Sequence, residues 1–161
     1  MISAPDFEQK ICALEAFKTR AGELFRPLVF TNGCFDLLHR GHVTYLAQAR
    51  ALGKSLVVGV NSDESLRRLN KGTNRPINSL AERMAVIAAL ESVSLVVPFA
   101  EETPLGLILL CRPDVLVKGA DWTASEIVGA KEVASWGGSV QTIPLTYQTS
   151  TTRIIAKIRE N

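Results

Sequence analysis

The stretch TNGCFDLLHRGH, residues 31–42, decides how this chain folds. It leaves an apolar run at residues 28–31, turns at Gly33 and enters a helix near Gly41, as a strand–turn–helix unit does. The first backbone N–H groups of a helix lack intrahelical acceptors, and the helix dipole adds partial positive charge there. The stretch therefore predicts a phosphate site at the end of a buried strand, and Gly41 lets the phosphate approach the backbone.

His39 and His42, the two histidines of the chain, stand three residues apart. This spacing is close to one helical turn, so both imidazoles can face one ligand and donate hydrogen bonds to phosphoryl oxygens. A single histidine in this position is more often a cap or a surface residue. Zinc bound by both histidines, with Asp36 nearby, is the other alternative, but the further ligands that zinc needs are absent at typical spacing. The pattern favours phosphate, and we expect no metal site.

Outward from this stretch, apolar runs alternate with helical patterns. Strands are expected at residues 28–31, 56–60, 93–97, 115–117 and 139–143. Helices are expected at residues 41–52, 62–69, 79–90, 104–111 and 126–136, with Ser79 and Thr103 as N-caps. The alternation predicts an α/β fold, a doubly wound, five-stranded parallel sheet of the Rossmann-like kind, with ligands at the carboxyl ends of the strands.

The composition narrows the class of protein. The chain has 161 residues, 47% of them hydrophobic, and 18 basic side chains against 16 acidic ones leave a net charge of only +2. This balance predicts small-molecule substrates, with no nucleic acid and no membrane as partner. The three cysteines form no CxxC pair, and neither a signal-peptide core nor an apolar run of membrane length is present. We therefore expect a cytoplasmic protein.

Other candidate ligand groups follow the later strands. The polar loop 70–78 contains Lys71 and Arg75, and Lys118 and Gly119 follow the fourth strand together with Asp121 and Trp122. The hydroxyls at residues 150–152 precede a final helix and predict a second phosphate grip, although N-capping alone would explain them. Asp36 and Asp63, which follow the first two strands, could bind sugar hydroxyls or orient water on Mg²⁺, or could be turn residues.

From residue 28 to the C-terminus the sequence resembles the HxGH nucleotidyltransferases. The strings TNGCFDLLHRGHVTYL, KGTNRPIN, PDVLVKGADW and STTRII, at residues 31–46, 71–78, 113–122 and 150–155, and the helix start at Glu82-Arg83-Met84 resemble the branch of that family that makes ADP-heptose. The resemblance implies transfer of an adenylyl group from ATP, accompanied by Mg²⁺, to D-glycero-β-D-manno-heptose 1-phosphate for lipopolysaccharide inner-core synthesis. It divides the chain into an N-terminal helical appendage, residues 1–26, and a nucleotidyltransferase domain, residues 27–161, which we expect to act as a stand-alone enzyme.

The resemblance also distributes roles among the candidate residues. Catalysis falls to His39, His42 and Lys71, the last bridging the incoming phosphate and the α-phosphate of ATP. Nucleotide binding falls to Asn32, Gly33, Cys34, Phe35, Gly41, Lys118, Gly119, Asp121, Ser150, Thr151 and Thr152. Asp36, Asp63, Arg75 and Trp122 are the candidates for binding the sugar phosphate, although Arg75 could be a solvated loop residue and Trp122 an ordinary half-buried aromatic.

Three alternatives stay open at this point. The first is a cytidylyltransferase that acts on glycerol phosphate or a similar alcohol phosphate. The second is a nucleotide-binding module without catalysis, and the third is a scaffold subunit that docks through the N-terminal helix. We also expect a homo-oligomer, a dimer or larger, because relatives associate and symmetric dimers are common.

Overall fold

A computed structural model describes residues 5–69, 74–119, 126–144, 146–147 and 149–160. The strands are β1 (Leu28–Gly33), β2 (Ser55–Asn61), β3 (Leu95–Phe99), β4 (Val115–Gly119) and β5 (Ser139–Ile143). The helices are the 3₁₀ helix η1 (Asp6–Lys10), α1 (Leu14–Gly22), α2 (Arg40–Arg50), α3 (Asp63–Arg68), α4 (Leu80–Ala88), α5 (Leu105–Cys111), α6 (Ala130–Ser135) and α7 (Thr151–Arg159).

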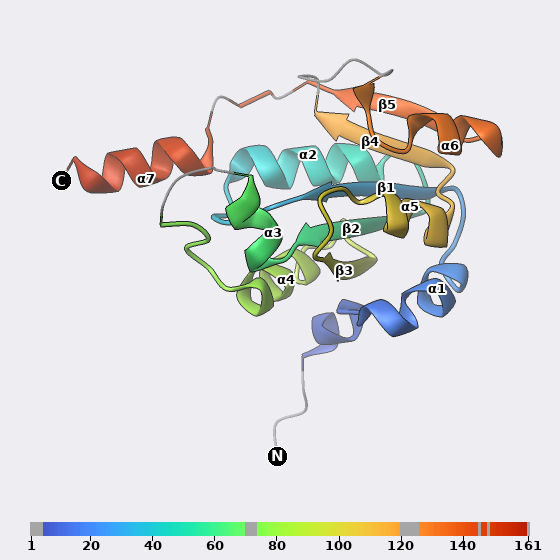
Figure 1. The fold of residues 1–161 in the computed structure, drawn as a ribbon, viewed down its shortest axis with the longest axis horizontal. Coiled ribbons are helices and arrows are strands. Elements are labelled where there is room, and N and C mark those ends of the chain that lie inside the picture. The colour runs from blue at the N-terminus through green and yellow to red at the C-terminus, as the bar shows by residue number, and fades with distance from the viewer. Residues whose placement is uncertain (1–4, 70–73, 120–125, 145, 148, 161) are drawn as a thin grey trace.

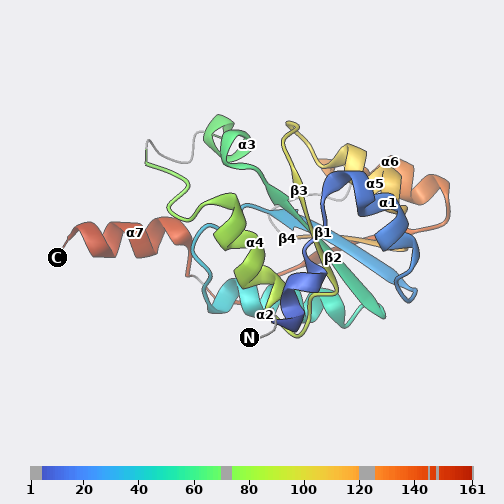
Figure 2. The same ribbon diagram turned by 90° about the horizontal axis from the view of Figure 1, so that it is seen from below.

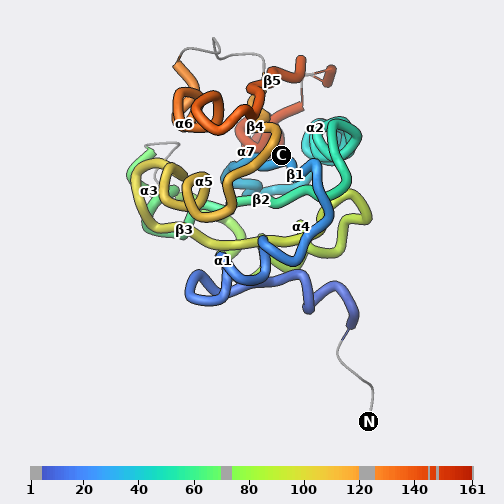
Figure 3. Tube along the Cα trace, turned by 90° about the vertical axis from the view of Figure 1, so that its right-hand side faces the viewer, coloured from blue at the N-terminus to red at the C-terminus, as the bar shows by residue number. Residues whose placement is uncertain are grey.

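The five strands form one parallel sheet in the order β3-β2-β1-β4-β5, which Figure 3 shows from the side. β1 lies in the middle, paired with β2 on one side and with β4 on the other. The chain thus winds outward in one direction from β1 to β3 and then returns to the other side of β1. This reversal of strand order is the point at which open α/β sheets bind ligands, and it confirms the predicted doubly wound sheet.

Side chains of the central strands alternate between two cores, one on each face. Leu28 and Phe30 of β1 pack on the face that α1, α5 and α6 cover, whereas Val29 packs on the face of α2 and α4 (Figure 2). The three side chains have no exposed surface. A strand buried on both faces consists of a continuous apolar run, which explains why the sequence pattern located these strands well.

The N-terminal residues do not form one continuous helix as the spacing of their apolar residues predicted. The backbone is extended around Ile11 and Cys12, because the Cys12 N–H donates to the carbonyl oxygen of Val96 at 2.8 Å and Ile11 bridges to β3. The predicted helix is present as α1, which lies beside β3 (Figures 1 and 3) and buries Phe17 in the core. Pairing with the edge of the sheet therefore interrupts the helix.

The helix starts show which predicted caps form. The N–H of Glu82 donates to Ser79 Oγ at 3.4 Å, as the sequence predicted for α4. Thr103 was the wrong choice for α5, because the N-cap position is occupied by Pro104 and no side chain caps the helix. Among the described residues, no helix has the length and apolar character needed to span a bilayer.

Candidate active site

A cavity of about 950 Å³ opens at the carboxyl ends of the strands. Most of the predicted site residues that the structure describes line it: Asn32, Gly33, Cys34, Phe35, Asp36, His39, Gly41, His42, Arg75, Lys118, Gly119, Ser150, Thr151 and Thr152. They come from β1, the loop after it, the start of α2, the loop before α4, the end of β4 and the start of α7. The fold therefore brings these distant segments to one place.

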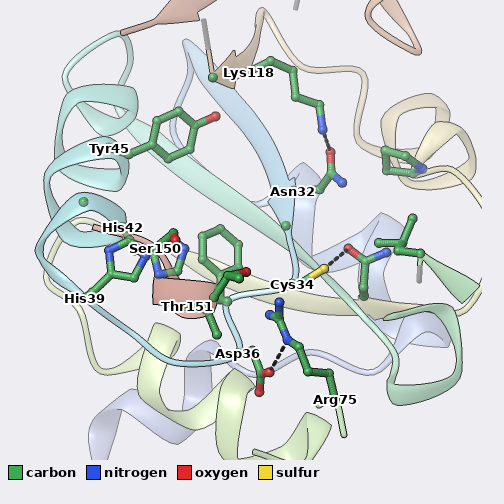
Figure 4. A pocket seen from close by; sticks show the side chains of 18 of the residues that line it. Asn32, Cys34, Asp36, His39, His42, Tyr45, Arg75, Lys118, Ser150 and Thr151 are labelled. Carbon is green, nitrogen blue, oxygen red and sulfur yellow. Dashed lines mark hydrogen bonds and ion pairs between the residues drawn. The ribbon is translucent and has the colours of Figure 1, made fainter. Parts of the chain in front are cut away.

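The two histidines lie together at the start of α2. His39 is the N-cap residue, its side chain makes no cap hydrogen bond, and its ring stacks on that of His42 with 3.7 Å between centroids. Its Nδ1 is buried without a hydrogen-bond partner among the described residues. Buried polar atoms of this kind normally find a partner in water or a ligand. Figure 4 shows both rings at the side of the cavity, next to Ser150 and Thr151.

A left-handed backbone conformation places the ring of Phe35 against His42. Phe35 has φ of +47°, a left-handed conformation that is costly for a large side chain. Its ring meets His42 edge-on, with centroids 5.2 Å apart, and a Cβ at Gly33 would lie only 2.9 Å from it. A Cβ at Gly41 would likewise lie 3.0 Å from the His39 ring. A side chain at either position would therefore push the neighbouring ring out of its place.

The start of α7 faces the same cavity, as the sequence predicted. Ser150 caps the helix by accepting from the Arg153 N–H at 3.2 Å, and the Thr151 hydroxyl donates to the Leu37 carbonyl oxygen at 3.3 Å. The guanidinium of Arg40 lies 4.1 Å above the centre of the Tyr147 ring. These contacts hold the N-termini of α2 and α7 on one cavity, where both present free N–H groups to an anion.

The far wall of the cavity carries polar side chains from the central strands. The Lys118 ammonium donates to Asn32 Oδ1, across the junction of β1 and β4 (Figure 4). On β1 itself, Thr31 Oγ1 lies 2.8 Å from the Tyr45 hydroxyl. Burial raises the pKa of Tyr45 to about 12, so its hydroxyl stays protonated at neutral pH. The sequence analysis did not single out Tyr45, whose apolar neighbours on α2 gave no sign that its hydroxyl reaches the site.

The two predicted aspartates, Asp36 and Asp63, make different contacts. Asp36 lines the cavity, but its fully buried carboxylate is paired with Arg75 Nε at 2.9 Å. Asp63 is not among the residues that line the cavity, and it pairs with Arg83 Nη2 at 2.7 Å. The predicted residues Lys71, Asp121 and Trp122 lie outside the described part of the chain.

Arg83 is a site-supporting residue to which the sequence analysis gave no role. Its side chain has no exposed surface and donates four hydrogen bonds, of 2.6 to 3.1 Å, from α4 to the segments that surround the cavity. The acceptors are the carbonyl oxygens of Cys34, Asn61 and Asn78 and the carboxylate of Asp63. The loop that carries the histidines is thereby fixed to the carboxyl end of β2 and to the start of α4.

Glu102, Glu126 and Tyr147 also line the cavity, although no local sequence motif marked them as site residues. Within the described ranges, no three histidine, cysteine, aspartate or glutamate side chains gather in a way that could hold a metal ion.

Burial lowers the pKa of His39 below its ordinary 6.5. The stability that this group contributes is therefore present above pH 6.5 and is lost as the pH falls through the lowered, folded-state pKa. We expect ¹H NMR of the ring protons to give a His39 midpoint below 6.5, with the variant His42→Gln assigning the two signals. Added tripolyphosphate should raise the midpoint, because a nearby anion favours the imidazolium. A midpoint that does not move with tripolyphosphate bound would show that His39 does not face the anion.

Comparisons with known proteins agree with this geometry. A family model described as cytidylyltransferase-like matches residues 30–157. The chain is 50% identical over 161 residues to the D-beta-D-heptose 1-phosphate adenylyltransferase of Bordetella bronchiseptica, and the match covers 99% of each chain. It is 54% identical over 153 residues to the bifunctional protein HldE of Pseudomonas aeruginosa, where it covers 95% of this chain but spans 31% of that protein.

Solved structures show the same fold. A lipopolysaccharide core biosynthesis protein from Thermoplasma volcanium is 26% identical with a TM-score of 0.60, covering 76% of this chain and 98% of the other. A pantothenate synthetase from Thermus thermophilus, at 17% identity, superposes with a TM-score of 0.62 over 92% of this chain and 69% of the other, and shows the fold alone. The family match extends over most of the sequence and includes the paired histidines, so the chain belongs to the cytidylyltransferase-like family of nucleotidyltransferases.

Proposed function

We propose that this protein is an adenylyltransferase that converts D-glycero-β-D-manno-heptose 1-phosphate and ATP to ADP-heptose and pyrophosphate, for lipopolysaccharide inner-core synthesis. The observation that carries the proposal is the meeting of the His39–His42 pair with the start of α7 on one cavity, in a chain that matches a heptose 1-phosphate adenylyltransferase end to end. The cavity volume, about 950 Å³, is at the upper end of the range for ligand sites, as two ligands side by side require.

In the proposed reaction an oxygen of the sugar phosphate attacks the α-phosphorus of ATP. The new P–O bond forms as the bond between the α-phosphorus and the bridging oxygen breaks, and pyrophosphate leaves. The second ionisation of a sugar phosphate lies near pH 6, so the nucleophile is already charged at neutral pH and needs no general base. The enzyme mainly has to align two anions and stabilise the charge that develops between them.

The described residues suit these tasks. His39 and His42 donate to the triphosphate, and the free N–H groups at the starts of α2 and α7 hold the leaving phosphates from two sides. Lys118, Asn32 and Gly119 at the carboxyl ends of β1 and β4 contact the nucleotide. Mg²⁺ arrives on the ATP phosphates, with most of its ligands from phosphate and water. The roles of Lys71, Asp121 and Trp122 remain proposals from the resemblance.

Pyrophosphate release with Mg²⁺ tests the substrate pair, with ATP and CTP offered in turn against heptose 1-phosphate and glycerol phosphate. We expect release with ATP plus heptose 1-phosphate alone. Release with CTP plus glycerol phosphate would retain the mechanism and replace the substrates. Tight ATP binding without any release would leave a nucleotide-binding module and overturn the proposed activity.

We further propose that the protein works in the cytoplasm as a homo-oligomer. In Figures 1 and 2, α7 extends away from the sheet, and Ile158 near its end is 67% exposed. Ile154 lies one turn earlier on the same side of the helix, so a second copy of the chain would cover an apolar edge there. Light scattering coupled to gel filtration should give a mass at least twice the 17.5 kDa of one chain, and a mass of 17.5 kDa would contradict the proposal.

A further inference from the structure

The loop before α4 brings one guanidinium into the cavity. Arg75 lines the cavity with its side chain only 8% exposed, and its Nε donates to Asp36 Oδ2 at 2.9 Å. No other hydrogen bond of this guanidinium is formed within the described residues. Figure 4 shows it pointing from Asp36 towards Cys34 and the interior of the cavity.

Asp36 is held firmly enough to orient this guanidinium. Its side chain is fully buried, and Oδ1 accepts the N–H groups of Ile77 at 2.8 Å and Asn78 at 3.0 Å. The Asn78 side chain in turn donates to the Asp36 carbonyl oxygen at 2.8 Å. The carboxylate therefore accepts hydrogen bonds from two backbone N–H groups and from Arg75. A shift of the loop before α4 would break these hydrogen bonds.

The contact leaves one forked edge of the arginine available. A guanidinium binds phosphate bidentately through two parallel N–H groups. Because Asp36 accepts from Nε, the edge formed by Nη1 and Nη2 can still make such a pair of bonds. A lysine at this position would offer a point charge but no fork.

Position decides which phosphate this edge meets. The two helix N-termini that suit the triphosphate, those of α2 and α7, adjoin the histidines, Ser150 and Thr151. Arg75 comes from the loop that precedes α4, and in Figure 4 its guanidinium lies beside Asp36 and below Cys34, whereas the histidine pair lies next to Ser150. A triphosphate held at these two helix starts would therefore leave the Arg75 guanidinium for a second anion.

We propose that Arg75 binds the phosphate of the acceptor through its Nη1–Nη2 edge, and that Asp36 is the positioning residue that aims it. This inference rests on the proposed function in that it takes the cavity to hold a phosphorylated acceptor beside ATP. It assigns the preference for a phosphate-bearing acceptor, over the free sugar, to one side chain. It also gives Asp36 a task other than the contact with sugar hydroxyls that the sequence suggested.

The test measures binding and turnover for Arg75→Gln and Arg75→Lys. Calorimetric titration with heptose 1-phosphate should show binding weakened roughly tenfold to a hundredfold in Arg75→Gln, as loss of charge-assisted hydrogen bonds predicts, and by less in Arg75→Lys. The KM for the acceptor should rise in parallel. The affinity for ATP should change by about twofold or less, because the lost contact is one to the acceptor alone. Arg67→Gln, an exposed arginine of α3, is the matched control and should leave both affinities unchanged.

Asp36→Asn tests the positioning role separately. The amide keeps the shape but turns an N–H towards Arg75, so the acceptor KM should rise while the KM for ATP does not. In the double variant with Arg75→Gln, the losses of acceptor-binding free energy should sum to much less than the two single losses, because both act through one contact. Additive effects, or equal rises in both KM values, would overturn the positioning role.

The results separate this inference from the proposed function. If the wild type makes ADP-heptose and Arg75→Gln binds the acceptor as tightly as the wild type, the inference is overturned and the function stands. If the wild type makes no ADP-heptose but binds another phosphorylated acceptor through Arg75, the function fails and the inference stands. A wild type that binds no phosphorylated acceptor overturns both.

Discussion

Replacing His42 by alanine is expected to lower turnover on the order of a hundredfold or more, as the loss of one donor to a transition-state oxygen does. His42 lies in the first turn of α2, where its ring stacks on that of His39 and meets the ring of Phe35 edge-on. The side chain therefore has one fixed orientation, and removing it leaves the phosphoryl oxygens without that donor. Pyrophosphate release with ATP and heptose 1-phosphate measures the effect.

The kinetic pattern distinguishes this role from simple binding of ATP. An interaction that strengthens in the transition state lowers kcat, whereas loss of uniform binding raises KM alone, and we expect the larger effect of His42→Ala in kcat. His42→Asn, which can still donate an N–H, should retain more activity than the alanine variant. A His42→Ala protein that is folded by circular dichroism and turns over at close to the wild-type rate would contradict the mechanism.

Replacing Arg83 by methionine is expected to cost about 3–5 kcal/mol of unfolding free energy, because each buried acceptor left without its donor costs about 1–3 kcal/mol and the carbonyl oxygens of Cys34 and Asn61 are two of them. The substitution removes a fully buried guanidinium and leaves three carbonyl oxygens and the Asp63 carboxylate without their donor. Methionine fills much of the volume, so the loss measures the hydrogen bonds more than a cavity. Urea unfolding followed by circular dichroism gives the difference.

Two comparisons make this result specific. Arg67→Met, at an exposed position of α3, should change the unfolding free energy by about 0.5 kcal/mol or less, as surface substitutions do. Arg83→Lys keeps the charge but cannot reach all four acceptors, and its stability should lie between that of wild type and Arg83→Met. A methionine variant within about 1 kcal/mol of wild type would show that the buried network is not a major source of stability.

The sequence predicted the fold well because its signals were local and strong. The apolar runs that became β1, β2 and β3 are largely buried, and a glycine turn followed by paired histidines marked the start of α2. The N-cap at Ser150 was also visible, since hydroxyl residues before a helix are a local signal. The interruption near Cys12 was not, because it depends on a hydrogen bond to β3 more than eighty residues away.

The supporting contacts of the site were harder to predict for a similar reason. Asp36 was recognised as a polar residue after a strand, but its partner Arg75 comes from a loop 39 residues further along. Arg83 carried a signal that could have been used. Positions 83, 84, 87 and 88 form the buried stripe of α4, and an arginine within an otherwise apolar stripe indicates a buried guanidinium with several acceptors.

Helix α7 is fixed to the protein mainly at its first turn, where Thr151 is the one buried residue of the nine in the helix. Its later amides are therefore expected to exchange with solvent deuterium much faster than those of β1, since local opening there breaks few contacts. A triphosphate that binds only when the first turn is folded stabilises the helix against local opening by its binding free energy. The exchange rate of α7 then reports on occupancy of the nucleotide site, although most of the helix extends away from the site.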